Sequence, residues 1–109
     1  MNAVDAVQAV EFACHRALNV PEDTMSRVML LEALASLKST PLDLFPENVL
    51  ALVNRSRDQA DALSDRVLAS NSLSHPSIDR KIRAVCQTTS SLAAAMRPPS
   101  ARNAGGTRE

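Results

Sequence analysis

The chain has 109 residues and a mass of 11.7 kDa, a size that corresponds to one domain. Its 12 basic and 12 acidic residues give a formal charge of zero, so no overall field directs it towards nucleic acid or a membrane. There are two aromatic residues, and the two glycines both lie in the last five positions, which excludes stacking platforms and a phosphate-binding glycine loop from the body of the chain. We therefore expect no small-molecule substrate and no cofactor.

Cellular location is suggested by what the sequence lacks. It has no apolar run of the length that a membrane-spanning helix needs, and Asp5 and Glu11 interrupt the N-terminal stretch where a signal peptide would be apolar. Cys14 and Cys86 lie too far apart in sequence for a metal-binding or redox motif. We expect a cytoplasmic protein that does not insert into a membrane.

Prolines divide the chain into four segments of helical length, because proline is tolerated in the first turn of a helix but not in its interior. Alanine and leucine outnumber the β-branched residues between them, which favours helix over strand. The predicted helices cover approximately residues 3–19, 22–39, 47–70 and 77–96. We expect one all-α, four-helix bundle-like domain over residues 1–97, followed by a disordered tail over residues 98–109 that lacks hydrophobic periodicity.

The first two segments are more apolar than a small domain requires. In the first, the polar residues share one helical stripe and the rest of the circumference is apolar, which predicts contact on two sides; the stripe consists of Asp5, Gln8, Glu11, His15, Arg16 and Asn19. The second follows Pro21 and is apolar almost all round, so we expect it to be the most buried helix.

The third and fourth segments carry the spacing of a coiled coil, in which core positions recur every 3.5 residues. The seam positions are Val49, Val53, Ser56, Ala60, Leu63 and Val67, and then Ile78, Ile82, Val85, Thr89, Leu92 and Met96. Because the connector is short, we expect a long antiparallel hairpin. The register places Ser56 opposite Thr89, the one hydroxyl residue in each seam, where a hydrogen bond would fix the alignment. The same pattern can also be satisfied between two chains.

Few residues suggest catalysis or metal binding. Asp58, Asp61 and Asp65 share one helix face, as Mg²⁺ ligands do in some helical bundles, but a second set of acids on a facing helix is lacking. Cys14 and His15 are adjacent on a helix and therefore point about 100° apart. We expect no metal site and no enzymatic activity.

The start of the fourth segment is basic, with Arg80, Lys81 and Arg83 close together. Basic side chains at the N-terminus of a helix can contact phosphate, so a nucleic-acid-binding regulator is the alternative function. The seam residues of this segment require a protein core, however, and the preceding helix is longer than helix-turn-helix motifs need. Nucleic-acid binding is therefore the less favoured interpretation.

The apolar excess of the first two segments favours a protein partner, either a second copy of the chain or another protein's helix. We expect a non-enzymatic protein–protein interaction module that forms a homo-oligomer or docks a partner helix, with Val4, Val7, Val10, Leu30 and Leu34 as the partner-binding residues. Its size, charge pattern and helix content are similar in general terms to those of small bacterial adaptors, secretion chaperones and antiactivators. No motif assigns the chain to one family.

Overall fold

The computed structural model describes residues 2–70 and 72–97. Over these ranges the chain forms no strand and four α-helices: α1 (Ala3–Asn19), α2 (Thr24–Ser39), α3 (Leu50–Leu68) and α4 (Pro76–Met96). Two short 3₁₀ turns, η1 (Leu42–Leu44) and η2 (Glu47–Val49), lie between α2 and α3. The predicted all-α fold is confirmed, and the tail predicted over residues 98–109 lies outside the described residues.

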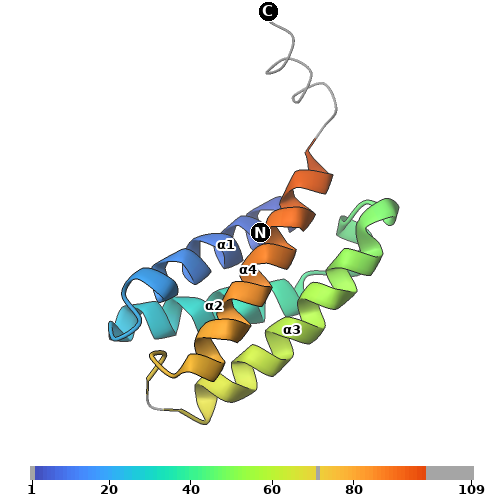
Figure 1. Ribbon diagram of the computed structural model, residues 1–109. Coiled ribbons are helices and arrows are strands. Elements are labelled where there is room, and N and C mark those ends of the chain that lie inside the picture. Colours follow the sequence, from blue (N-terminus) through green and yellow to red (C-terminus); the bar gives the residue numbers. More distant parts are fainter. Residues whose placement is uncertain (1, 71, 98–109) are drawn as a thin grey trace, which may run out of the picture.

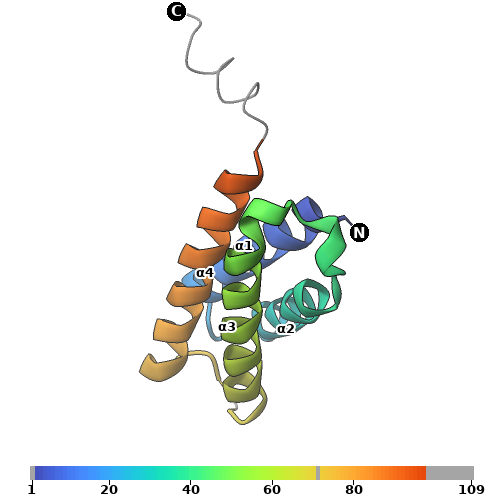
Figure 2. The same cartoon turned by 90° about the vertical axis from the view of Figure 1, so that its right-hand side faces the viewer.

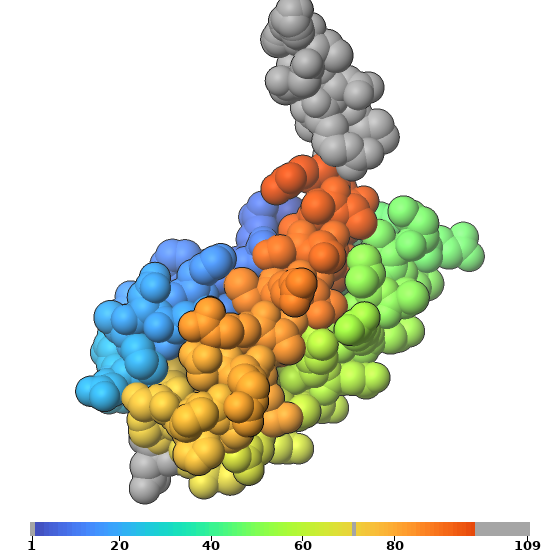
Figure 3. Space-filling view, in the orientation of Figure 1, coloured from blue at the N-terminus to red at the C-terminus, as the bar shows by residue number. Residues whose placement is uncertain are grey.

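The helices form an antiparallel bundle in which each helix packs against two others (Figures 1 and 2). Helix α1 contacts α2 and α4, and α3 contacts the same two helices. The hairpin of α3 and α4 therefore has α1 and α2 packed across one of its faces, as the sequence predicts, and α1 is in contact on two sides. Figure 3 shows α4 at the centre of one face of the molecule, with α1 along one flank and α3 along the other.

Local side chains determine where the helices begin. Asn2 Oδ1 accepts a hydrogen bond from the Asp5 N–H at 2.8 Å and caps α1. Helix α2 begins at residue 24 rather than the predicted 22, because the Asp23 carboxylate is the cap and accepts from the Met25 N–H at 3.2 Å. The start of α4 is capped by His75, whose Nδ1 accepts from the Ser77 N–H at 3.1 Å.

The connection between α2 and α3 shortens the third helix relative to its prediction. Residues 47–49 form the 3₁₀ turn η2 after Pro46, so α3 begins at Leu50, and it ends at Leu68 instead of residue 70. Phe45 lies in this connection, and its side chain is buried against the core. The aromatic ring thus closes one end of the bundle.

The seam between α3 and α4 forms within the chain. Every seam position except Met96 is buried, and Met96 is half-buried against the core. The expected hydrogen bond between Ser56 and Thr89 is absent: the Thr89 hydroxyl donates to the carbonyl oxygen of Val85 at 2.8 Å, while Ser56 Oγ is buried without a hydrogen-bond partner. A threonine hydroxyl in a helix can donate a hydrogen bond to a carbonyl oxygen of the preceding turn. Thr89 forms this local hydrogen bond instead of one to Ser56 across the seam.

The relative burial of the first two helices differs from the prediction. Helix α1 buries seven side chains, whereas α2 buries five and exposes Met25 and Val28. The reason is the composition of α1, whose buried positions are mostly alanine, so that the neighbouring helices approach it closely. The most buried of these two helices is therefore α1.

Candidate interaction surface on helix α1

The outward side of α1 carries apolar side chains among polar ones. Val4 is 45 % exposed and Phe12 is 60 % exposed, although most large apolar side chains of the described chain are buried. Gln8 lies between them, one helical turn from each, and is exposed. We call Val4, Gln8 and Phe12 the outer stripe of α1. Two hollows in the surface lie beside this stripe, one on each side.

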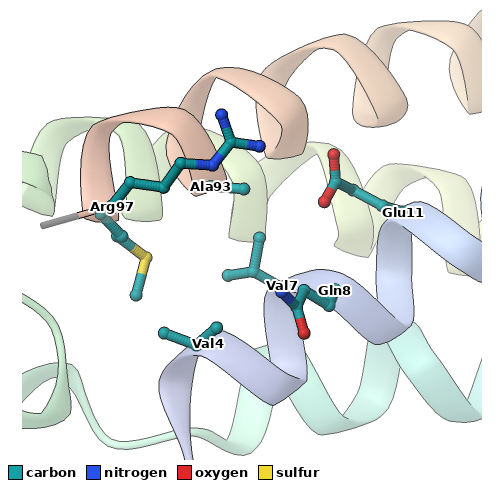
Figure 4. A pocket seen from close by; sticks show the side chains of 7 residues that line it. Val4, Val7, Gln8, Glu11, Ala93 and Arg97 are labelled. Carbon is teal, nitrogen blue, oxygen red and sulfur yellow. The ribbon is translucent and has the colours of Figure 1, made fainter. Parts of the chain in front are cut away.

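The first hollow lies between α1 and the C-terminal end of α4 and has a volume of about 140 Å³. Figure 4 shows the residues that line it, which are Val4, Val7, Gln8 and Glu11 from α1, Ala93 and Met96 from α4, and Arg97 directly after α4. Valine, alanine and methionine side chains make its apolar part. Glu11 at the rim is fixed in place, because its Oε2 accepts a hydrogen bond from the Ser90 hydroxyl at 2.8 Å. This α1–α4 hollow is below the usual size of a small-molecule site and can hold one apolar side chain.

The second hollow lies between α1 and α2 and has a volume of about 220 Å³. The space exists because several of the residues that face it from both helices are small, and the large exposed phenyl ring of Phe12 lies at its edge. The lining consists of Ala9, Phe12, Ala13, Met29, Glu32, Ala33 and Ser36. We call it the α1–α2 hollow. A protruding ring beside a recess is a common feature of surfaces that pack against another protein.

The five predicted partner-binding residues are separated by the fold. Val4 is exposed on the outer stripe, and Val7 is 1 % exposed at the base of the α1–α4 hollow. Val10, Leu30 and Leu34 are fully buried in the core of the single chain. These three side chains stabilise the bundle, and in this fold they offer no surface to a partner.

Phe12 was not among the predicted partner-binding residues, although the sequence contains a signal that its side chain is exposed. It lies one helical turn from Gln8 and is therefore on the polar stripe of the first segment. An aromatic residue on an otherwise polar stripe is exposed when the opposite side of the helix forms the core. Val4 meets the same criterion.

The thiols form part of the interface between α1 and α4. Cys86 Sγ lies 3.7 Å from His15 Nε2, so the partner of this histidine is on another helix and not the adjacent Cys14. Burial raises the pKa of the Cys14 thiol to about 12, with smaller contributions from Cys86 and the Glu11 carboxylate. Burial, followed by the charge of Glu11, also raises the pKa of Cys86. Both groups are neutral thiols at pH 7, whereas a nucleophilic cysteine needs a lowered pKa.

The basic residues at the start of α4 do not form one patch. Arg80 and Arg83 are exposed, and Arg83 Nε donates to Asp79 Oδ2 at 2.8 Å. Lys81 is half-buried. At 100° per residue, Lys81 and Arg83 point to opposite sides of the helix. The cluster in the sequence is thus divided between two flanks in space.

The three aspartates of α3 are exposed along its outer face. Asp61 Oδ1 accepts from Lys38 Nζ at 2.9 Å and so links α3 to α2. No group of three or more histidine, cysteine, aspartate or glutamate side chains in residues 2–70 and 72–97 is arranged to hold a metal ion. None of the described helices has the length and apolar character needed to cross a membrane.

Comparison with known proteins identified no relative of the chain. No family model matches the chain, and no significantly similar curated protein or solved structure was found.

Proposed function

We propose that this chain is a non-enzymatic protein–protein interaction module, a small helical adaptor, chaperone or regulator of the cytoplasm. It acts by self-association or by docking a partner's helix on the outer stripe of α1 and the two hollows beside it. Of the residues predicted from the sequence, this surface includes Val4 and the nearly buried Val7. It also includes Phe12, which was not among them.

The single observation that carries the proposal is the exposed phenylalanine. Phe12 is 60 % exposed beside a recess lined largely by small side chains. Complete burial of such a side chain stabilises an assembly by about 1.5–3 kcal/mol, and Val4 on the same stripe would add to this. Aromatic anchors of this kind provide much of the binding free energy in protein interfaces.

A non-enzymatic role is supported by the chemistry of the remaining groups. The raised pKa values of Cys14 and Cys86 argue against a thiolate nucleophile. The two hollows beside the outer stripe are smaller than typical substrate pockets, and the larger hollow of about 440 Å³ further along α1 and α4 contains Cys86, whose pKa is raised. The alternative of nucleic-acid binding has weaker support, because Arg80, Lys81 and Arg83 do not share one side of α4.

Site-specific photocrosslinking tests the proposal. The photoreactive residue p-benzoylphenylalanine replaces Gln8, which lies between Val4 and Phe12, in cells that produce the chain. The matched control places it at Asn54, another exposed amide residue, on α3. We expect a discrete crosslinked species from position 8 that disappears when Phe12→Gln is added, and none from position 54. Equal crosslinking from both positions, or none from position 8, would contradict the proposal.

A further inference from the structure

We propose that the partner of this surface is a second copy of the chain, which packs its α1 antiparallel against the first across a two-fold axis. This inference rests on the proposed function and specifies the partner. A two-fold interface pairs a surface with itself, so each copy must carry both a protruding group and the recess that receives it. Phe12 and the α1–α2 hollow meet this requirement on adjacent parts of one face.

The sequence of α1 sets the register of this contact. Asp5, Ala9, Phe12 and Arg16 are spaced by four, three and four residues and therefore share one stripe, which we call the self-pairing stripe. When two such stripes run antiparallel, Phe12 of each copy lies opposite the small Ala9 of the other. The phenyl ring then enters the α1–α2 hollow beside Ala9.

Charge supports the antiparallel direction. The same register places the exposed Asp5 opposite Arg16 of the other copy, at both ends of the contact. Arg16 donates to Asp23 Oδ2 at 2.6 Å and to Ser26 Oγ at 3.3 Å, and its guanidinium has five N–H groups in all. A parallel arrangement would instead place Asp5 against Asp5 and Phe12 against Phe12.

The overall charge also permits two copies to associate. The formal charge of the chain is zero, so no long-range repulsion opposes contact between identical molecules. Met25 is 52 % exposed and lies one helical turn before Met29, which lines the α1–α2 hollow, so it adds apolar surface next to that hollow. The face thus combines apolar contact at its centre with opposite charges at its ends, which is typical of a specific interface.

Sedimentation velocity of the purified full chain over a range of concentrations tests this inference. We expect a reversible dimer whose dissociation constant rises about tenfold or more in Phe12→Gln, since the ring that fills the recess is lost. Leu68→Gln is the matched control, because Leu68 is 64 % exposed at the end of α3, and it should change the constant by less than about twofold.

Charge reversal tests the register. Asp5→Arg places two arginines opposite each other in the antiparallel dimer and should weaken it several-fold at low salt, with a smaller effect at high salt. Asp58→Arg, the same change on the exposed face of α3, should have no effect. Circular dichroism checks that each variant keeps its helix content. A dimer that is insensitive to Phe12→Gln or to Asp5→Arg would overturn the inference.

The crosslinking experiment above separates the two levels of the proposal. If the chain is monomeric at every concentration and position 8 crosslinks to a different, defined polypeptide, then the second copy is excluded and the interaction module stands. If the chain is monomeric and position 8 gives no discrete crosslink, both proposals fail.

Discussion

Cys14 illustrates how a single side chain couples stability to pH. It is fully buried on α1, and burial is the main reason that its pKa rises from the ordinary 9.0 to about 12. Between these two values the unfolded chain loses the thiol proton and the folded chain keeps it. Since the folded state then binds more protons, stability is complete below pH 9 and falls as the pH rises towards 12.

We expect the free energy of unfolding to fall by roughly 2 kcal/mol from this residue by about pH 10.5, as measured by denaturant titration at a series of pH values. Cys14→Ala should remove most of this dependence, because it removes the titrating group. The chain has no tyrosine and only Lys38 and Lys81 among lysines, so Cys86, whose pKa burial also raises, is the main other side chain expected to change stability in this range. An equally steep fall in Cys14→Ala would contradict the assignment.

Ser56 is one of three residues in the described part of the chain with a buried side-chain polar atom that has no hydrogen-bond partner. Its hydroxyl oxygen is buried in the seam between α3 and α4 without a hydrogen-bond partner, because Thr89 donates within its own helix. A buried polar group without a partner is destabilising. We expect Ser56→Ala to raise the free energy of unfolding by about 1 kcal/mol, measured by urea titration. Thr89→Ala, which removes a methyl group from the same layer and leaves Ser56 unpaired, should instead lower it.

At the scale of the elements, two arginines connect the antiparallel helices α2 and α3. Arg27 on α2 donates through Nη2 to the carbonyl oxygens of Val67 and Ser70 at the end of α3, at 3.0 and 3.3 Å. Arg57 on α3 donates in the same way to the carbonyl oxygens of Lys38 and Thr40 at the end of α2. The C-terminal carbonyl groups of a helix lack partners within it and carry partial negative charge, so each cation satisfies them from the neighbouring helix.

Loss of one such contact should be measurable. We expect Arg57→Leu to lower the free energy of unfolding by about 1.5–3 kcal/mol, because it removes charged hydrogen bonds and leaves the carbonyl oxygens at the end of α2 unpaired. Arg55→Leu provides the control, since Arg55 is an exposed arginine two positions away on the same helix. Chemical denaturation of both variants measures the difference. Equal stabilities would show that the capping by Arg57 contributes nothing.

At the scale of the whole molecule, the distribution of charge separates the two candidate functions. Arg80 and Arg83 are exposed on α4, whereas the outer stripe lies on α1. Replacing Arg80, Lys81 and Arg83 with glutamine removes positive charge without changing the α1 surface. We expect the dissociation constant for self-association of this variant, measured by sedimentation, to stay within about twofold of the original value. We expect its affinity for duplex DNA, measured by fluorescence anisotropy, to fall by no more than the loss of a non-specific phosphate contact would cause. If the chain bound DNA with a salt-sensitive affinity and the triple substitution abolished this binding, the result would favour the nucleic-acid-binding regulator.

Much of the architecture could be predicted from the sequence because local rules govern it. Prolines and capping residues limit the helices, and the heptad spacing by itself identifies the seam positions of α3 and α4. Small boundary differences, such as the start of α2 at Thr24, arise where a side chain caps a helix that propensity alone would extend. The connection ending in η2 could not be read in this way, because a 3₁₀ turn and the first turn of an α-helix share their preferences.

The sequence by itself thus determined that the chain is helical, where its helices lie and which sides of α3 and α4 meet, since these follow from periodicity along the chain. Only the tertiary structure decided which apolar residues of α1 and α2 remain at the surface. Val4 and Val10 are equally apolar, yet Val4 is 45 % exposed and Val10 is fully buried. The difference depends on the two neighbours of α1, α2 and α4, and α4 lies far from it in the sequence. For the same reason, the pairing of His15 with Cys86 and the hollow beside Phe12 became visible only in the folded bundle.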